Sequence, residues 1–366
     1  MIVRQIDMIQ FMGKVAGKKN ICCFGAGAAL TRFLTDFQEY HIENDIKFIV
    51  DNSMEKQGTM MLCNGKYIQV VSLLQMLAAI TPEDIILITT AKFPEILEQL
   101  NKQKELDNME CYLHTLLRIE KYDCDRLRID VPNKLSIYQE QKIPKVIHYC
   151  WFGKKEMPSQ YRKWMESWKI YCPDYEIIEW NEENYDVYKN EYLRQAYESG
   201  KWAFVSDYAR IDIVHQYGGV YLDTDVELLK NIDELLMNDG FCGFETSEYV
   251  AYGLGFGAKK KSTILGAIKE YYDNINFEFK NGNLKDIVCP KIQTEVMKRY
   301  GLVCNGEYQV LEEMTVYPSR VLCGMSPYSL KVQCDSTTFA IHHFAASWVD
   351  DVQRNARQAI ISYLKQ

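Results

Sequence analysis

The sequence predicts an α/β protein with two domains, the first built on a doubly wound parallel sheet. Two observations lead to this fold class. Short apolar runs alternate with helical patterns in both halves of the chain, and this alternation is typical of parallel strands joined by crossover helices. The length of 366 residues also suits two hydrophobic cores, because a domain takes roughly 150 residues.

The first domain is expected to begin with a strand, a glycine turn and a helix. An apolar run at 20–24 stops at Gly25-Ala26-Gly27, and a helical pattern follows at 28–37. The same reasoning predicts strands at 46–50 and 85–89 and helices at 71–80 and 94–104.

The glycine turn is a candidate nucleotide-binding site. Gly25 and Gly27 precede a helix N-terminus, which can receive a phosphate, and Asp51 follows the next strand, where a carboxylate can hold a ribose. Leu30 stands where the dinucleotide fingerprint has its third glycine. The turn resembles those of the small Rossmann-like modules in bacterial polysaccharide-biosynthesis proteins. A nucleotide site and a plain scaffold turn both remain open.

Between the two domains the chain becomes rich in charge and loses its periodicity. This change covers about 116–142 and includes Pro132. We therefore expect the first domain at residues 1–120, a linker at 121–142 and the second domain at 143–366.

The second domain is expected to open with a strand at 143–153, a helix at 159–171 and a strand at 175–180. Trp151 lies at the end of the first of these strands, and open α/β sheets bind ligands beyond the carboxyl ends of their strands. The indole of Trp151 can stack on a nucleobase there. The alternative is a tryptophan in the core.

The segment 204–226 has the clearest signals for helix and strand ends in the chain. Ser206 or Asp207 can cap a helix that ends at Gly218-Gly219, and a strand at 220–222 then leads to Asp223-Thr-Asp225. Asp207 and Arg210 are three residues apart, so they share a face of the predicted helix.

The paired aspartates predict a divalent metal site. Residues two apart on an extended segment point the same way, so Asp223 and Asp225 can present both carboxylates to one ion. Hard oxygen ligands suit Mg²⁺ or Mn²⁺, and the open coordination positions can take a diphosphate. Asp207 and Arg210 can hold sugar hydroxyls and a phosphate oxygen.

Several motifs in order resemble glycosyltransferase family 32, the Asp-x-Asp sugar transferases that include bacterial capsular-polysaccharide enzymes and yeast α-mannosyltransferases. The resemblance covers the second domain. It is carried by the segments 143–153, 167–168, 172–175, 206–225 and 342–348.

The resemblance implies a GT-A fold and sugar transfer from a nucleotide-sugar with retention of anomeric configuration. It implies that Trp151 stacks on the base and that Asp207 and Arg210 hold the donor sugar. It also implies that the Asp-x-Asp pair serves metal and ribose. Three further residues are expected at the donor: Tyr221, Ser347 and Trp348. Catalytic roles are therefore expected for four residues: Asp207, Arg210, Asp223 and Asp225.

A histidine is expected to complete the metal site. Residues 338–343 form a predicted strand, so His342 and His343 point to opposite sides and only one can face the metal. We favour His342 as the third ligand beside Asp223 and Asp225. Glu245 is a further candidate contact, and no residue is named as the general base.

Other functions use the same residues. A haloacid-dehalogenase-like phosphatase would use Asp223 as nucleophile and Asp225 as acid/base, but Glu227 stands where that family has Thr or Val. An NAD-dependent oxidoreductase would use the glycine turn and Asp51, but the first domain lacks a convincing Tyr-x-x-x-Lys. A binding module with a decayed site is the third alternative.

Composition and charge restrict the expected classes of binding partner and the expected location in the cell. The net charge of −8 and the lack of a basic run argue against a nucleic-acid partner. No apolar run reaches the ~20 residues of a membrane span, and residues 1–20 do not resemble a secretion signal. We expect a cytoplasmic enzyme, with peripheral contact at the inner face of the membrane left open. Its expected partners are a UDP- or GDP-linked sugar and a saccharide or lipid-linked saccharide acceptor of surface (capsular) polysaccharide synthesis.

Overall fold

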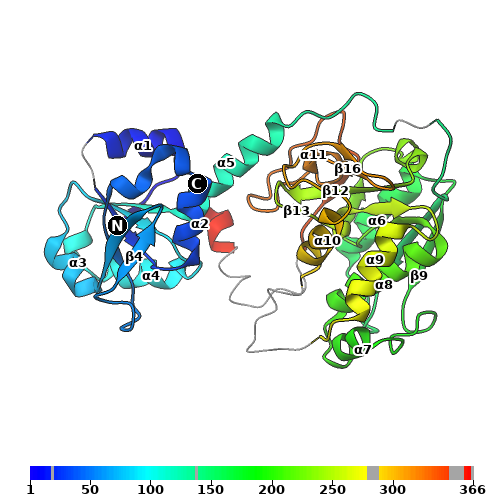
Figure 1. The fold of residues 1–366 in the computed structure, drawn as a ribbon, viewed down its shortest axis with the longest axis horizontal. Coiled ribbons are helices and arrows are strands. Elements are labelled where there is room, and N and C mark those ends of the chain that lie inside the picture. The colour runs from blue at the N-terminus through cyan, green and yellow to red at the C-terminus, as the bar shows by residue number, and fades with distance from the viewer. Residues whose placement is uncertain (18–19, 137–138, 278–287, 346–357, 364–366) are drawn as a thin grey trace. The chain divides into compact units, whose positions relative to one another are not determined.

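A computed structural model describes residues 1–17, 20–136, 139–277, 288–345 and 358–363. The chain divides into two compact units, and Figure 1 shows both. Unit 1 comprises residues 1–124 and the C-terminal segment from residue 349, and unit 2 comprises residues 125–348. Each unit has its own sheet and its own hydrophobic cores.

The described residues of unit 1 form a seven-stranded sheet in which all neighbours are parallel except β4 and β5. The chain order reverses between β2 and β6, as in doubly wound sheets. The predicted parallel sheet is therefore confirmed. Across the sheet the strands are β1 (Ile2–Val3), β7 (Glu110–Leu113), β6 (Ile85–Ile88), β2 (Ile21–Phe24), β3 (Ile46–Val50), β5 (Lys66–Val71) and β4 (Met60–Cys63).

Buried apolar strands and amphipathic helices make up unit 1, as the periodicity predicted. All four residues of β2 and of β6 are buried, which is typical of central parallel strands covered on both faces. The hairpin of β4 and β5 was missed, although its Asn64-Gly65 turn is a strong hairpin signal. The helices are α1 (Met8–Ala16), α2 (Ala28–Asp36), α3 (Leu73–Ala79), α4 (Phe93–Asn101) and α5 (His114–Arg128).

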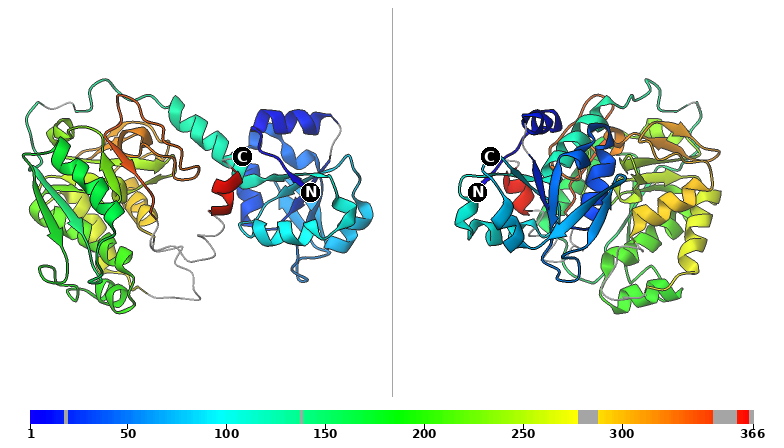
Figure 2. Two further views of the ribbon diagram at one scale, coloured as in Figure 1. Left: turned by 180° about the vertical axis from the view of Figure 1, so that it is seen from behind. Right: turned by 60° about the vertical axis from the view of Figure 1, so that its left-hand side comes forward.

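The C-terminal end of the chain belongs to unit 1, and this differs from the predicted domain at 143–366. Residues 358–363 are helical, coloured red in Figures 1 and 2. Ile360 is buried among core residues of unit 1. The predicted linker at 121–142 is also partly helical, because α5 extends to Arg128. Sequence periodicity cannot show which core a short terminal helix joins.

The described residues of unit 2 form a mixed eight-stranded sheet. β8, β9 and β10 are parallel, whereas β14 runs antiparallel to both β10 and β12. β10 and β12 therefore point the same way. In order the strands are β15 (Gln309–Val310), β16 (Thr315–Tyr317), β12 (Gly240–Thr246), β14 (Phe256–Ala258), β10 (Gly219–Tyr221), β8 (Val146–Cys150) and β9 (Glu176–Trp180), with β13 (Tyr249–Val250) paired to β12.

Helices cover both faces of this sheet. Alternate strand residues point to two cores: Cys150 and Tyr221 to one, and Ile147 and Val220 to the other. The first core is covered by α7 (Glu191–Glu198), α8 (Trp202–Tyr217), α9 (Thr263–Asp273) and α10 (Cys289–Lys298). The second is covered by α6 (Ser159–Tyr171) and α11 (Ser319–Leu322). A separate two-stranded ribbon pairs β11 (Val226–Leu228) with β17 (Ala340–His342).

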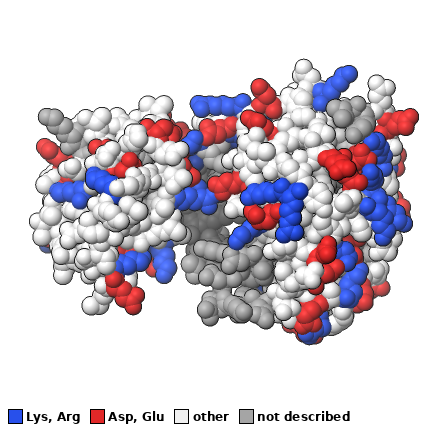
Figure 3. Space-filling view, viewed as in Figure 1, with Lys and Arg blue, Asp and Glu red and all other residues white. Residues whose placement is uncertain are grey.

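The distribution of charged side chains and of cysteines is typical of a globular protein. On the face shown in Figure 3, acidic and basic side chains are interspersed. The twelve cysteines all lie in the described ranges and are free, and most of them are buried. Within those ranges no helix is both long and apolar enough to cross a membrane.

Candidate functional site

The predicted site residues of unit 2 gather at one edge of its sheet. β8, β10 and β12 run in the same direction, so their carboxyl ends meet at this edge. Trp151 follows β8, and Asp223 and Asp225 follow β10. Glu245 is the second-last residue of β12. The sheet topology therefore places these side chains at the edge where open α/β sheets bind ligands.

Asp223, Asp225 and His342 form a group that can hold a metal ion. Each offers one ligand atom, and these atoms all lie within 4.8 Å of one another. The Nε2 atom of His342 lies 3.2 Å from Oδ1 of Asp225. Two carboxylates and one imidazole suit Mn²⁺ or Mg²⁺ and leave positions open for a ligand. The donor set therefore fits the expected metal.

The two aspartates meet in a turn, which corrects the expected extended segment. The amide of Val226 donates to the carbonyl of Asp223 at 3.0 Å and closes this turn. The backbone of residues 343–345 then encloses Asp225. The amide of His343 donates to the carbonyl of Asp225, and the amide of Ala345 donates to its carboxylate, both at 2.9 Å. The carboxylates converge because the turn is closed in this way.

Charges in the group are strongly coupled. Burial alone would raise the pKa of Asp225, but the charge of His342 and the hydrogen bond from it lower the pKa to about 2. Burial alone would lower the pKa of His342, but Asp225 outweighs burial and raises it. Burial raises the pKa of Asp223, against the opposing charge of Arg210. Asp225 and His342 thus each favour the charged form of the other.

Arg210 joins α8 to the aspartate turn. Its guanidinium pairs with Asp207 and lies 3.3 Å from Asp223. The ring of Tyr221 packs below it, 5.3 Å from the guanidinium carbon. At Gly253 a Cβ atom would lie 2.6 Å from Oδ2 of Asp223 and 3.1 Å from Nη1 of Arg210. Glycine is needed there for space, a requirement that sequence reasoning missed.

The predicted start of helix α8 needs correction. α8 begins at Trp202 with Lys201 as its N-cap, so neither Ser206 nor Asp207 caps it. The hydroxyl of Ser206 instead donates to the carbonyl of Trp202. Asp207 is buried inside the helix, where burial raises its pKa and Arg210 opposes this. An apolar first turn outweighed the capping signal, because Phe204 and Val205 belong to the core.

Tyr221 lies in the core beside the site. Its side chain is buried in the core, 1% exposed, although we expected it at the donor. As a residue within β10, it shares a core with Cys150, and its hydroxyl interacts with Asp223. The structure therefore places it under Arg210 as support.

Trp151 lies at the sheet edge and is partly exposed, whereas Trp168 is the core tryptophan. The indole nitrogen of Trp151 donates to the carbonyl of Lys155 at 2.7 Å. Its ring meets Tyr161 edge-on, with centroids 5.9 Å apart. This arrangement holds the indole in place while part of it stays open to a ligand.

His342 and His343 point to opposite sides, as the strand pattern predicted. His342 faces the aspartates, and His343 instead pairs with Glu227, Nε2 to Oε2, at 2.8 Å. His343 also stacks on Trp164, with centroids 4.2 Å apart. Ser347 and Trp348 lie outside the described residues.

In unit 1 the glycine turn is held by Asp51. One carboxylate oxygen accepts from the amide of Ala26 at 2.9 Å and from Lys56 at 3.0 Å, and the other accepts from the amide of Ser53. At Gly25, whose φ is 122°, a Cβ atom would meet the carbonyl of Thr89 at 2.9 Å. These contacts give Asp51 a role in shaping the turn. Gly25, Gly27 and Asp51 stay together, and nucleotide binding there remains a prediction.

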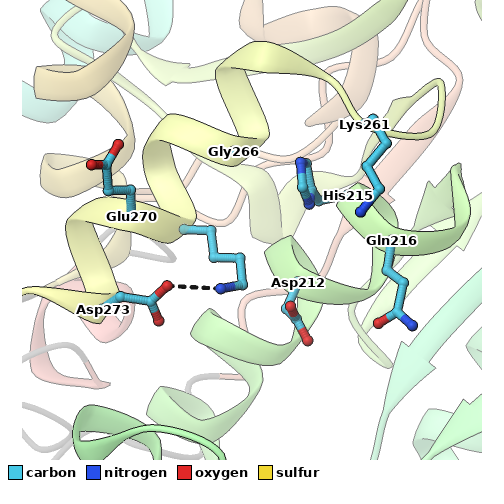
Figure 4. A pocket seen from close by; sticks show the side chains of 8 residues that line it. Asp212, His215, Gln216, Lys261, Gly266, Glu270 and Asp273 are labelled. Carbon is cyan, nitrogen blue, oxygen red and sulfur yellow. Dashed lines mark hydrogen bonds and ion pairs between the residues drawn. The ribbon is translucent and has the colours of Figure 1, made fainter.

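A surface depression of about 430 Å³ lies between α8 and α9, shown in Figure 4. Three of its charged groups have protein partners: Lys269 pairs with Asp273 at 2.7 Å, and Asp212 pairs with Lys189. It does not include the aspartate and histidine group. Its lining residues are Asp212, His215, Gln216, Lys261, Gly266, Lys269, Glu270 and Asp273.

A comparison with known protein families matches the segment that contains the predicted site residues. Residues 158–242 match the family described as a glycosyltransferase sugar-binding region containing a DXD motif. The match begins just before α6 and contains Asp207, Arg210, Asp223 and Asp225. This segment is therefore similar to a glycosyltransferase sugar-binding region, and families with this motif typically bind a divalent metal.

Three curated fungal relatives are each 31% identical to part of the chain. Inositol phosphoceramide mannosyltransferase 3 of Schizosaccharomyces pombe aligns over 31% of this chain and 34% of its own length. Mannosyl phosphorylinositol ceramide synthase SUR1 of Saccharomyces cerevisiae aligns over 38% and 41%. Inositol phosphoceramide mannosyltransferase 1 of S. pombe aligns over 28% and 34%. The chain thus spans between a third and two fifths of the length of these relatives.

Among solved structures, PaToxG glycosyltransferase matches with a TM-score of 0.37 and 14% identity, over 50% of this chain and 76% of that chain.

Proposed function

We propose that the protein is a metal-dependent glycosyltransferase that moves a hexose, with mannose the first candidate, from a nucleotide-sugar to an acceptor. The observation that carries this proposal is the group of Asp223, Asp225 and His342 beside the Asp207–Arg210 pair. Four of these five residues lie within the segment that matches the sugar-binding region. The proposal extends to a GT-A fold for unit 2 and to retention of configuration.

Each residue has a role in this proposal. Asp223, Asp225 and His342 hold Mn²⁺ or Mg²⁺, which when bound neutralises the charge on a leaving nucleoside diphosphate. Asp207 accepts hydrogen bonds from donor-sugar hydroxyls, and Arg210 keeps Asp207 and Asp223 in place. Arg210 is 4% exposed, so its main contacts are these two carboxylates.

The donor nucleotide occupies the same sheet edge in this proposal. Trp151 presents a partly exposed indole for the base, and Ser347 and Trp348 contact the diphosphate. Glu245 lies at the end of β12, and its negative charge helps to raise the pKa of His342. That influence supports a place for Glu245 beside the donor or acceptor sugar. No side chain is assigned as nucleophile.

The acceptor is the least constrained partner. The relatives' names describe transfer of mannose to inositol phosphoceramide, a lipid. This supports a lipid-bearing acceptor, either a lipid headgroup or a lipid-linked saccharide of surface polysaccharide synthesis. Peripheral contact with a membrane would follow from such an acceptor.

Donor hydrolysis tests the proposal directly. UDP- and GDP-linked sugars are screened with Mn²⁺ and with chelator, and release of nucleoside diphosphate is measured. Metal-dependent release from a nucleotide-mannose supports the proposal. Phosphate release from a simple monoester, without turnover of any nucleotide-sugar, would favour the phosphatase that uses Asp223 and Asp225 instead. Reduction of NAD at the glycine turn would favour the oxidoreductase.

A further inference from the structure

His342 reaches the aspartates on a strand that the main sheet does not hold. β17 pairs with β11 in the two-stranded ribbon, and the last pair of this ribbon is Val226 with His342. The two partners are 116 residues apart in the chain. The position of His342 therefore depends on how the end of this short ribbon is fixed.

Helix α6 anchors the first strand of the ribbon. The indole nitrogen of Trp168 donates to the carbonyl of Val226 at 2.9 Å, and the hydroxyl of Ser167 accepts from the amide of Leu228 at 2.8 Å. Trp168 and Ser167 are both buried. β11 is thus attached to α6 through its backbone at both ends.

His343 anchors the second strand, and it does so through its side chain. Its ring lies almost parallel to that of Trp164 on α6, with an interplanar angle of 12° and centroids 4.2 Å apart. Its Nε2 atom lies 2.8 Å from the carboxylate of Glu227 on β11. Trp164 and Glu227 therefore hold one ring from two different elements.

The chain turns immediately after this anchor. Phe344 has a φ of 49°, so the ribbon cannot extend past His343. The ring of Phe344 meets that of His342 edge-on, with centroids 4.4 Å apart, so this side chain contacts the end of β17 together with His343. The amide of His343 donates to the carbonyl of Asp225, which ties the same point to the metal group.

We infer that Glu227 and Trp164 are positioning residues for the metal site: by clamping His343 they set where His342 stands relative to Asp223 and Asp225. The inference rests on the proposed metal role of these three residues. The clamp is partly exposed, with side-chain exposures of 17% for His343 and 36% for Glu227. Such a pair contributes little to global stability, so its effect is expected in metal affinity.

Manganese binding by the full chain, measured by calorimetry without donor or acceptor, tests the clamp. We expect Glu227→Gln and Trp164→Ala each to weaken Mn²⁺ binding by about tenfold, the lower end of the effect of residues that bond metal ligands directly. Trp164→Phe keeps a stacking ring and is expected to retain most of the affinity. Ile170→Ala on the same helix, at a side chain that is 69% exposed, is the matched control with no expected effect.

Glu227→Gln could weaken metal binding in two ways: by moving His342, or by removing a negative charge near the metal. A double-mutant cycle with His342→Ala separates these two effects. If Glu227 acts through His342, adding Glu227→Gln to His342→Ala weakens binding no further. A second loss of equal size would mean that Glu227 acts by charge alone and would overturn the inference. Wild-type affinity in folded Glu227→Gln and Trp164→Ala variants would overturn it as well.

The same titrations distinguish this inference from the proposed function. Failure of the wild-type chain to bind Mn²⁺, or no effect of His342→Ala, would remove the metal site itself. Binding that depends on His342 but not on Glu227 or Trp164 would leave the metal site standing and remove only the clamp. Thermal unfolding of each variant checks that the fold is intact.

Discussion

The guanidinium of Arg210 lies 3.3 Å from the carboxylate of Asp223, and this partly buried contact joins helix α8 to the Asp-x-Asp turn. The same guanidinium pairs with Asp207, one turn earlier on the helix. One cation thus stands between two carboxylates that would otherwise repel each other. The stability of unit 2 and the geometry of its site are therefore linked through one residue.

Replacing Arg210 by Met should destabilise unit 2 by up to about 3–5 kcal/mol, because it leaves the buried carboxylate of Asp207 and the partly buried carboxylate of Asp223 without their partner. Urea unfolding followed by tryptophan fluorescence measures this, since all six tryptophans lie between residues 151 and 348. Arg194→Met is the matched control: Arg194 pairs with two glutamates on the surface and should change stability little. Equal effects of the two substitutions would contradict the central role of Arg210.

Asp225→Asn should abolish sugar transfer and weaken Mn²⁺ binding at least tenfold while the fold is kept. The amide removes the negative charge that pairs with His342 and that a divalent cation requires. Donor hydrolysis and metal calorimetry measure the two effects. Asp174→Asn removes an exposed carboxylate paired with Lys145 and serves as the control. Unchanged transfer in the Asp225 variant would remove the metal argument.

Gly253→Ala should impair the site more than the fold. The new Cβ atom would lie 2.6 Å from Oδ2 of Asp223, so the carboxylate must move away from its present position. We expect a loss of metal and donor affinity with a small change in melting temperature. At Gly13 an added Cβ atom meets nothing within 4 Å, so Gly13→Ala is the control. Normal metal affinity after Gly253→Ala would show that Asp223 tolerates the shift.

Trp151→Ala should raise the KM for the nucleotide donor and leave stability nearly unchanged, because the indole is partly exposed at the sheet edge. Trp168→Ala provides the contrast. That side chain is fully buried, and its truncation should cost about 3–5 kcal/mol. A loss of stability with normal donor affinity in the Trp151 variant would return this residue to a purely structural role.

Unit 1 should lose stability in mild acid because of His114. Burial lowers the pKa of His114 from its ordinary 6.5 to about 4, and its Nδ1 atom bonds to the carbonyl of Ile88 at 3.0 Å. Folding favours the neutral ring, so its contribution is complete above pH 6.5 and is lost as the pH falls from 6.5 towards 4. The loss should reach about 3 kcal/mol.

Hydrogen exchange of unit 1 peptides at a series of pH values measures this loss. His114→Asn keeps a donor for Ile88 and removes the titration, so its unit 1 stability should vary much less over the same range. If the variant and the wild type lost stability in parallel, groups other than His114 would be responsible.

Local pattern predicted the strands of the sheets that correspond to β2, β3, β6, β8, β9 and β10, but not β1, β4, β5, β7 or β12 to β16. The strand at 46–50 and the helix at 159–171 have the predicted bounds, because burial on both faces or on one helical stripe leaves a periodic trace in a short stretch. The hairpin of β4 and β5 escaped, although its Asn64-Gly65 turn was visible. The start of α8 was misplaced because a capping residue was weighed above an apolar turn.

The sequence was enough to name most residues of the candidate site. It was only partly enough to predict how their side chains lie in space. Four of its residues lie within 19 residues of sequence, so their spacing was enough to predict that they share a site: Asp207, Arg210, Asp223 and Asp225. The glycines of 252–257 suggested close approach to a ligand or a turn, but not that Gly253 leaves space for Asp223 and Arg210, which are distant in the chain. Tyr221 was expected at the donor but lies in the core, since its place within the strand decides which side it faces.

The amino-acid sequence by itself determined the α/β class, the Asp-x-Asp pair and the strand that carries two adjacent histidines, because each depends on neighbours along the chain. Only the tertiary structure decided that His342 faces the aspartates while His343 pairs with Glu227. It also decided that the C-terminal helical residues join unit 1 and that Asp51 holds its own glycine turn. These outcomes depend on packing between segments far apart in the chain, and no local period records which distant surface a side chain will meet.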